Sequence, residues 1–92
     1  MELEFEWDSE KEEGNIRKHG VSFHEGATVF SDPLSWTFPD PDHSVNEERF
    51  LTIGRSSYQK TLVVSHTDRG TRTRIINARP ATPSEIRDYE EG

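Results

Sequence analysis

Two spacings of apolar residues along the chain distinguish predicted strands from predicted helices. Leu3 and Phe5 alternate with glutamates and lead to Trp7, and this period of two predicts a strand at the N-terminus. Alternating or β-branched runs predict four more strands, over residues 34–38, 49–54, 61–67 and 71–79. Residues 68–70 read Asp-Arg-Gly, a composition that favours a hairpin turn between the last two strands.

The first predicted helix is delimited by its capping residues. It begins at Asp8 or Ser9, and Glu12 stands at the spacing that completes a capping box with Ser9. It ends near His19, because Gly20 suits the left-handed position just beyond a helix. Its last turn is basic, which suits the negative end of the helix dipole.

Two further helices are predicted by the same signals. Ser22 and Glu25 have the spacing of a second capping box, and Pro33 ends the helix that follows. One face of this helix is apolar, with residues four and three apart: Phe23, Ala27 and Phe30. Thr82 and Glu85 form a third capping box, which predicts a short C-terminal helix.

The order of these elements predicts an α+β fold in a single domain, residues 1–92. A strand, two helices, four strands and a last helix indicate a small antiparallel sheet. The two N-terminal helices are expected to pack on one face of it, with Trp7, Phe23 and Phe30 in the core. The other face, or an edge, is then available to the polar residues of the strands.

Composition narrows the class of protein. Of the residues, 29% are hydrophobic and 32% are charged, and there is no cysteine, so a disulfide framework and a thiolate zinc site are excluded. No apolar run approaches the roughly 18 residues of a membrane helix, and the acidic N-terminus has no apolar signal core. The simplest interpretation is a cytoplasmic protein.

The net charge of −7 conceals an uneven distribution. Residues 1–48 carry a net charge of −10, residues 49–83 carry +6, and the last nine residues carry −3. Six of the seven bases in the middle segment are arginines, whose planar guanidinium groups suit phosphate. The local field therefore favours an anionic ligand despite the overall charge, unless these arginines pair with the acidic front half.

Several spaced motifs together resemble the BrnT family of toxins over essentially the whole chain. The motifs are Trp7-Asp8-x-x-Lys11-x-x-x-Asn15-x-x-Lys18-His19-Gly20-Val21-x-Phe23, Ala27-x-x-Phe30-x-Asp32-Pro33, Glu48-Arg49-x-x-x-Ile53-Gly54 and Arg74-Ile75-Ile76-x-Ala78-Arg79-x-Ala81-Thr82, with Glu85 and Tyr89. The chain departs from the pattern at Asn77, where members commonly have serine, and at Pro80.

The resemblance implies a RelE-like fold and a ribonuclease toxin of a type II toxin–antitoxin pair. Such a toxin cleaves RNA without a metal or other cofactor and inhibits translation. Its partner would be a ribbon-helix-helix antitoxin, similar to BrnA, that neutralises it in a complex repressing the shared operon. The resemblance leaves dimerisation open and implies no membrane association.

Metal-free RNA cleavage needs a proton acceptor, a proton donor and cations beside the phosphate, because the nucleophile is the 2′-hydroxyl of the RNA itself. Arg49 and Arg79, at the ends of predicted strands, are the candidate cations. Glu48, His19 and Lys18 are candidates for proton transfer and phosphate binding. Each has a structural alternative: an ion pair with Arg49 for Glu48, and the helix dipole for the basic pair.

Four other residues are candidates for binding RNA: Arg55, Arg72, Arg74 and Tyr89. Arg72 and Arg74 share parity along their strand and face one way, whereas Arg79 faces the other way unless a bulge redirects it. Tyr89 suits either stacking on a base or packing on the core, and we favour the core.

Two histidines are weaker candidates. His66 shares parity with Leu62 and Val64, which favours a packed, hydrogen-bonded core imidazole over catalysis. His43 stands with two aspartates in the loop 39–48, a weak signal for a metal site, and a flexible acidic loop is the preferred interpretation.

Two other classes of function remain open at this point. A non-catalytic module that binds protein or nucleic acid would be favoured if the arginines pair with the glutamates of residues 2–13. A metal-dependent nuclease would be silenced by EDTA.

Overall fold

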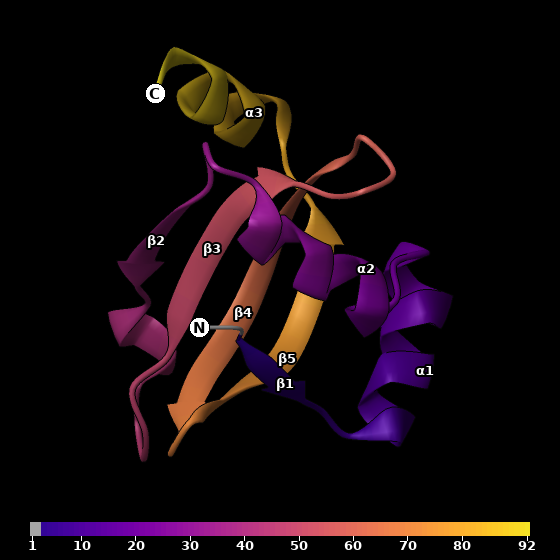
Figure 1. Ribbon diagram of the computed structural model, residues 1–92, viewed down its shortest axis with the longest axis vertical. Helices are drawn as coiled ribbons and strands as arrows, with labels where there is room; N and C mark the ends of the chain where they lie inside the picture. The colour runs from indigo at the N-terminus through magenta and orange to yellow at the C-terminus, as the bar shows by residue number, and fades with distance from the viewer. Residues whose placement is uncertain (1–2) are drawn as a thin grey trace.

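A five-stranded sheet forms the centre of the computed structural model, which describes residues 3–92 (Figure 1). The strands are β1 (Glu4–Glu6), β2 (Trp36–Pro39), β3 (Phe50–Arg55), β4 (Thr61–Arg69) and β5 (Arg72–Pro80). Their order across the sheet is β1-β5-β4-β3-β2, and only β1 and β5 are parallel. The predicted antiparallel sheet is confirmed, and the position of β1 beside the last strand is new.

The helices follow the predicted order. They are α1 (Ser9–His19), α2 (Phe23–Thr28) and α3 (Pro83–Glu91), with single 3-10 turns at η1 (Val29–Ser31) and η2 (Pro41–His43). Figure 1 shows α2 crossing one face of the sheet, α1 beside β5, and α3 beyond one end of the strands. Within residues 3–92, no helix combines the length and apolar character that spanning a membrane requires.

The larger core lies between the sheet and the α2–η1 segment, on what we call the helix-covered face. Its fully buried residues are Val21, Phe23, Val29, Leu62, Val64, Ile75 and Ala78. Trp7 and Phe30 are partly buried against this cluster, so the three predicted core aromatics are confirmed. Burial of each large apolar side chain stabilises the fold by roughly 1.5–3 kcal/mol.

The start of α1 distinguishes between the two predicted capping residues, Asp8 and Ser9. The side chain of Asp8 accepts hydrogen bonds from the backbone N–H groups of Glu10 (2.8 Å) and Lys11 (3.2 Å), so Asp8 is the N-cap. The predicted capping box between Ser9 and Glu12 is therefore wrong. The end of the helix is as predicted, because Gly20 has a φ of 70°.

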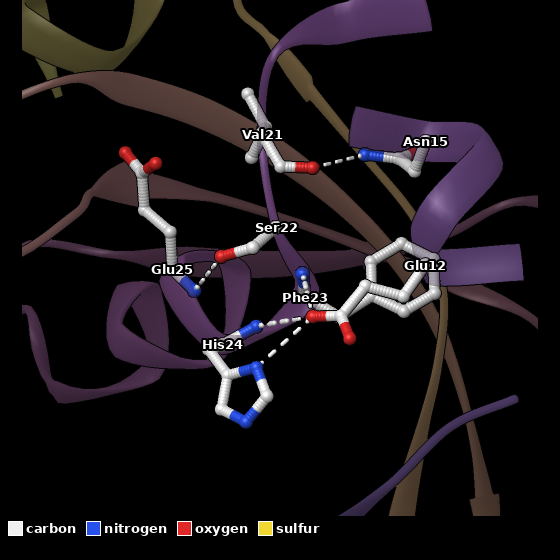
Figure 2. A network of polar contacts seen from close by, with 7 residues as sticks. All are labelled: Glu12, Asn15, Val21, Ser22, Phe23, His24 and Glu25. Atoms are coloured by element: carbon white, nitrogen blue, oxygen red, sulfur yellow. Dashed lines mark hydrogen bonds and ion pairs between the residues drawn. The ribbon is translucent and has the colours of Figure 1, made fainter. Parts of the chain in front are cut away.

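The side chain of Glu12 instead caps the following helix. Its Oε2 atom accepts hydrogen bonds from the N–H groups of Phe23 (2.9 Å) and His24 (3.3 Å), as Figure 2 shows. Ser22 Oγ accepts a third from the N–H of Glu25 (3.0 Å). The carboxylate of Glu25 points away from Ser22, so only half of the predicted box forms (Figure 2). The first N–H groups of α2 are satisfied across a tertiary contact.

The side chain of Asn15 completes the sheet where β1 ends. The strand β1 pairs only with residues 72–74, which leaves the backbone of Ala78 at a free edge. Asn15 Nδ2 donates to the carbonyl oxygens of Ala78 (2.7 Å) and Val21 (2.8 Å), and its Oδ1 accepts from the Ala78 N–H (3.2 Å). A buried amide with these partners joins α1 to β5 without an unsatisfied polar group.

One residue of β5 has no partner in the β4–β5 ladder. Ser65 lies opposite Asn77, whereas the next residue, His66, lies opposite Ile75. Ile76 is therefore the extra residue of a β-bulge. An extra residue reverses the alternation of side chains between the two faces of the sheet.

The bulge decides where Arg79 points. Ala78 lies in the helix-covered core, so its neighbour Arg79 faces the opposite side of the sheet. Before the bulge Ile75 faces the core, so Arg74 also faces that opposite side, which we call the open face. Arg79 therefore faces the same side as Arg72 and Arg74, because a bulge redirects it, which is the exception that the parity prediction allowed.

A smaller core holds α3 against the open face. Tyr89 is buried against Ile53 and Val63, and its hydroxyl donates to the carboxylate of Asp32. The predicted capping box of α3 is confirmed, with both of its hydrogen bonds present. The helix thus covers one end of the open face and leaves the rest exposed.

Candidate functional site

The open face contains a cavity of about 350 Å³ that brings the two predicted catalytic arginines together. Its lining includes Asp40, His43, Arg49, Ser65, Asn77 and Arg79, and we call it the arginine cavity. A second hollow of about 270 Å³ adjoins it and shares His43 and Arg49. The two hollows together form a continuous surface that combines the two arginines with the carboxylates of Asp40, Asp42 and Glu47.

The guanidinium group of Arg49 is only partly neutralised. Arg49 Nη2 lies 3.8 Å from Glu47 Oε1, and its Nε is buried without a hydrogen-bond partner among residues 3–92. The Arg49 N–H donates to Ser44 Oγ (2.9 Å), which positions the backbone just before β3. The side chain of Glu48 is exposed and lines neither hollow, so the carboxylate beside Arg49 is that of Glu47.

The guanidinium group of Arg79 is held by the first turn of α3. Its Nη1 and Nη2 atoms donate to the two carboxylate oxygens of Glu85, at 2.8 and 2.9 Å. The hydrogen bond from Arg79 lowers the pKa of Glu85 to about 2, and the same bond raises the pKa of Arg79. Arg79 Nη1 also donates to the carbonyl oxygen of Pro80 (3.3 Å), which leaves Nε–H and one N–H of Nη2 without an acceptor among the described residues. The orientation of Arg79 therefore depends on α3.

The side chains of Asp40 and His43 form a pair beside Arg49. His43 Nδ1 lies 2.8 Å from Asp40 Oδ2, and the imidazole is 67% exposed. The Asp40 N–H donates to the carbonyl oxygen of Arg49 (2.8 Å), which closes the segment into a turn. Apart from the η2 turn the segment 40–49 is a loop, and its flexibility stays a prediction. Within residues 3–92, no group of three or more His, Asp or Glu side chains is arranged to hold a metal ion.

Sequence reasoning missed this pair as a candidate for proton transfer. A carboxylate that accepts from Nδ1–H orients the ring and leaves Nε2 free to exchange a proton. The available signal was the three-residue spacing of Asp40 and His43 in a segment leading to Arg49. That spacing was considered only as a metal site.

Lys18 and His19 lie apart from this arrangement. Both belong to the last turn of α1, and neither lines the arginine cavity or the adjoining hollow. Their position matches the structural alternative, because basic side chains there complement the helix dipole.

Arg72 and Arg74 pair with the N-terminal strand. Arg74 Nη1 lies 2.9 Å from Glu6 Oε2, and Arg72 Nε lies 3.6 Å from Glu4 Oε2. These two arginines thus pair with glutamates of residues 2–13, which is the arrangement expected for a non-catalytic role. The two arginines of the cavity do not, because their carboxylate neighbours lie outside residues 2–13.

Arg55 and Tyr89 lie at the other end of the open face. Arg55 Nη2 is 3.9 Å from Glu90 Oε2, and Tyr89 packs in the smaller core as favoured above. Burial alone raises the pKa of Asp32, but hydrogen bonds from Tyr89 and from backbone N–H groups outweigh it and lower that pKa. The same hydrogen bond raises the pKa of Tyr89. Neither Arg55 nor Tyr89 lines the arginine cavity.

His66 is a core residue, as predicted. It is buried on the helix-covered face, and its Nε2 lies 2.7 Å from Thr52 Oγ1. Its ring packs against Phe30 and Phe50, and its Nδ1 is buried without a partner among the described residues. Burial lowers the pKa of His66 and disfavours its charged form.

The chain is a small α+β protein with helices on one face of its sheet. Two arginines lie in a hollow on the other face, which is a candidate site for an anionic ligand. The 1.1 Å crystal structure of the Brucella abortus ribonuclease toxin BrnT has this fold. It matches with a TM-score of 0.68 and 24% identity, over 88% of this chain and 99% of that chain.

The family model described as "Ribonuclease toxin, BrnT, of type II toxin-antitoxin system" matches residues 7–85. The chain therefore belongs to the BrnT family and is a ribonuclease toxin of a type II toxin–antitoxin system, which implies an RNA substrate and a cognate antitoxin. No curated protein matches the chain. The resemblance inferred from the motifs is confirmed.

Proposed function

We propose that the arginine cavity is the active site of a metal-independent endoribonuclease. The observation that carries the proposal is the shared lining of one cavity by Arg49, Arg79 and the Asp40–His43 pair. Arg49 lies just before β3, Arg79 lies in β5, and the Asp40–His43 pair lies at and just before the η2 turn. They supply the cations and the proton acceptor that cleavage by a 2′-hydroxyl requires.

In the proposed reaction the 2′-oxygen forms a bond to its own 3′-phosphorus and the bond from phosphorus to the 5′-oxygen breaks. His43 Nε2 takes the proton of the 2′-hydroxyl, while Asp40 holds Nδ1. The leaving 5′-oxygen takes a proton from water. The products are a 2′,3′-cyclic phosphate and a 5′-hydroxyl.

The arginines stabilise the extra negative charge on the phosphorus oxygens. Arg49 is partly exposed and its one ion pair among the described residues, with Glu47, is long at 3.8 Å, so its Nη groups have donor capacity for a phosphate. Arg79 is fixed by Glu85 before the substrate arrives. Such preorganised donors are worth roughly 10²–10³ in rate each.

The proposal is tested with the purified toxin and two oligonucleotides, one of RNA and one with a 2′-deoxy sugar at the cleaved position. We expect cleavage of the RNA in EDTA, with a 2′,3′-cyclic phosphate end, and no cleavage of the deoxy strand. His43→Ala should lower the rate by roughly 10²–10⁴. His24→Ala, an exposed histidine on α2, is the matched control. Cleavage of the deoxy strand, or inhibition by EDTA, would contradict the mechanism.

The cellular role proposed for this activity is inhibition of translation, released by a ribbon-helix-helix antitoxin that represses the shared operon. Family membership supports this role. Synthesis of the toxin alone should stop incorporation of labelled amino acids, and coexpression with the protein of the adjacent gene should restore it. Incorporation unchanged by the toxin would contradict the role.

The acidic residues of α1 are the proposed contact for a basic segment of that antitoxin. Glu10 and Glu13 are exposed, whereas Glu12 is engaged in capping α2. Reversal of Glu10 and Glu13 to lysine should weaken copurification of the antitoxin, and binding that is undiminished rejects this contact.

A further inference from the structure

The carboxylate of Glu47 lies between two arginines. Its Oε1 atom is 3.8 Å from Arg49 Nη2, and its Oε2 atom is 3.4 Å from Arg69 Nη2. Arg69 is the last residue of β4 and has no part in the proposed reaction. Each oxygen of this one carboxylate therefore faces the guanidinium group of a different arginine.

We propose that Arg69 is a further RNA-binding residue, which holds the phosphate next to the cleaved one, and that Glu47 occupies the place of that phosphate until RNA binds. This inference rests on the proposed function, because it takes the arginine cavity as the place where the strand is cut. A carboxylate and a phosphodiester both present two oxygens that share one negative charge. The same two guanidinium groups can therefore bind either anion.

The alternation of side chains along β4 places Arg69 on the open face. Ser65 lines the arginine cavity, and Arg69 follows it four residues later in the same strand. The extra residue of the β4–β5 ladder belongs to β5, so the alternation along β4 is unbroken. The side chain of Arg69 therefore lies on the same side of the sheet as the side chains of Arg49 and Arg79.

The register of the sheet sets the order of the three arginines on this face. Arg79 lies opposite Val63, six residues before Arg69. The β3–β4 register, continued by one residue, places Arg49 opposite Thr67. At roughly 3.3 Å per residue, Arg69 is about 7 Å beyond Arg49 along the strand direction and about 20 Å beyond Arg79. A nucleic acid strand that contacts all three arginines thus runs from Arg79 past Arg49 to Arg69.

The ion pair between Arg69 and Glu47 is one that a phosphate can replace. Both side chains are partly exposed, 51% for Arg69 and 34% for Glu47, and exposed pairs contribute little to stability because water and salt screen them. Neither ion pair of Glu47 is shorter than 3.4 Å. Glu47 also lines the hollow that adjoins the arginine cavity, so this hollow offers the strand a path beyond Arg49.

The alternative role for Arg69 is structural, in which it only fixes Glu47 beside Arg49. The two roles differ once Glu47 is neutralised. If Arg69 binds phosphate, Glu47→Gln removes a competing anion and tightens RNA binding, and Arg69 still contributes to affinity in that variant. If Arg69 acts only through Glu47, its loss has no further effect there.

The test measures, at several salt concentrations, binding of a fully 2′-deoxy strand, which keeps every phosphate and has no 2′-hydroxyl to cleave it. Arg69→Ala should raise Kd roughly threefold to tenfold and reduce the slope of log Kd against log salt by about 0.7, the value for one phosphate of a single strand. Glu47→Gln should lower Kd roughly threefold, and adding Arg69→Ala to it should raise Kd again. The maximal rate of RNA cleavage by Arg69→Ala in EDTA should stay within about threefold of wild type, because the contacted phosphate does not react.

Arg17→Ala, at an exposed arginine of α1, is the matched control and should keep the Kd and the salt slope of wild type. Wild-type Kd and slope for Arg69→Ala, together with normal cleavage of RNA, would overturn the inference and leave the proposed function standing. The same holds if the effect of Arg69→Ala disappears in the Glu47→Gln variant. Absence of RNA cleavage by the wild type would overturn the proposed function and this inference with it.

Discussion

The two faces of the sheet use polar groups in opposite ways. On the helix-covered face polar side chains tie elements together, as Glu12 does at the start of α2 and Asn15 at the edge of β5, although His66 Nδ1 is buried there without a partner among the described residues. On the open face Arg49 has only a long ion pair with Glu47, and Asn77 Oδ1 accepts no hydrogen bond from the described residues. One face therefore supplies stability, and the other keeps binding capacity for a ligand.

The arginines themselves differ between two regions of the open face. Arg72 and Arg74 lie beside β1, whose glutamates neutralise them. Arg49 and Arg79 lie where β1 does not reach, in a hollow that His43 of η2 also lines. The acidic N-terminus thus pairs with one set of arginines and not with the other, whose carboxylate neighbours are Glu47 and Glu85.

The largest effect that separates the two faces is expected from the core. Phe23→Ala removes a fully buried ring from the helix-covered face and should lower the free energy of unfolding by about 3–5 kcal/mol. Unfolding in denaturant measures this loss of free energy. Leu34→Ala, at a residue that is 72% exposed, is the control and should change stability by less than about 0.5 kcal/mol. Equal effects of the two changes would contradict the assignment of the core.

The next largest effect concerns cleavage. Arg49→Ala or Arg79→Ala should reduce the initial rate of RNA cleavage by roughly 10²–10³, because each removes a cation from the phosphate. Arg72→Ala should stay within about threefold of wild type, since a paired surface arginine contributes little. A loss for Arg72→Ala as large as for Arg49→Ala would place the active site nearer β1.

A smaller effect is expected at the junction of α1 and α2. Glu12→Ala removes the acceptor for two N–H groups of α2 and should cost about 0.5–2 kcal/mol, as other N-caps do. Glu13→Ala, the exposed neighbour on α1, is the matched control for the loss of one negative charge. Equal unfolding midpoints for the two variants would contradict the capping role of Glu12.

The smallest effect depends on pH. Burial lowers the pKa of His66, so the folded state binds its proton less readily than the unfolded state. Stability from this neutral imidazole is complete above the unfolded value of about 6.5 and falls as pH drops towards the folded value. Melting temperatures between pH 8 and 5 should show the fall, and His66→Leu should flatten it. His43→Ala should keep it, because that ring is exposed.

Local signals in the sequence predicted most of the fold. Gly20 ends α1, the Thr82–Glu85 box starts α3, and the element order is as expected. The error at Glu12 has a physical cause: a glutamate near a helix start can cap its own helix, and here it reaches another one at Phe23. Spacing alone does not distinguish the two, because the second partner is eleven residues away along the chain.

The candidate site was predictable in part. The arginine-rich middle segment and the two cationic positions, Arg49 and Arg79, were visible in the sequence. The pair formed by Asp40 and His43 was not assigned a role, because its value depends on lying beside Arg49. Lys18 and His19 were candidates because of their side-chain types, but they lie in the last turn of α1 and do not line the cavity.

By itself the sequence determined the family, the order of helices and strands and the aromatic core, since periodicity and caps act over a few neighbouring residues. Only the tertiary structure decided which groups share a cavity. One unpaired residue, Ile76, reverses the faces of everything after it in β5, and so brings Arg79 and Asn77 to the side of Arg49. That outcome depends on the pairing of β4 with β5, which no local pattern specifies.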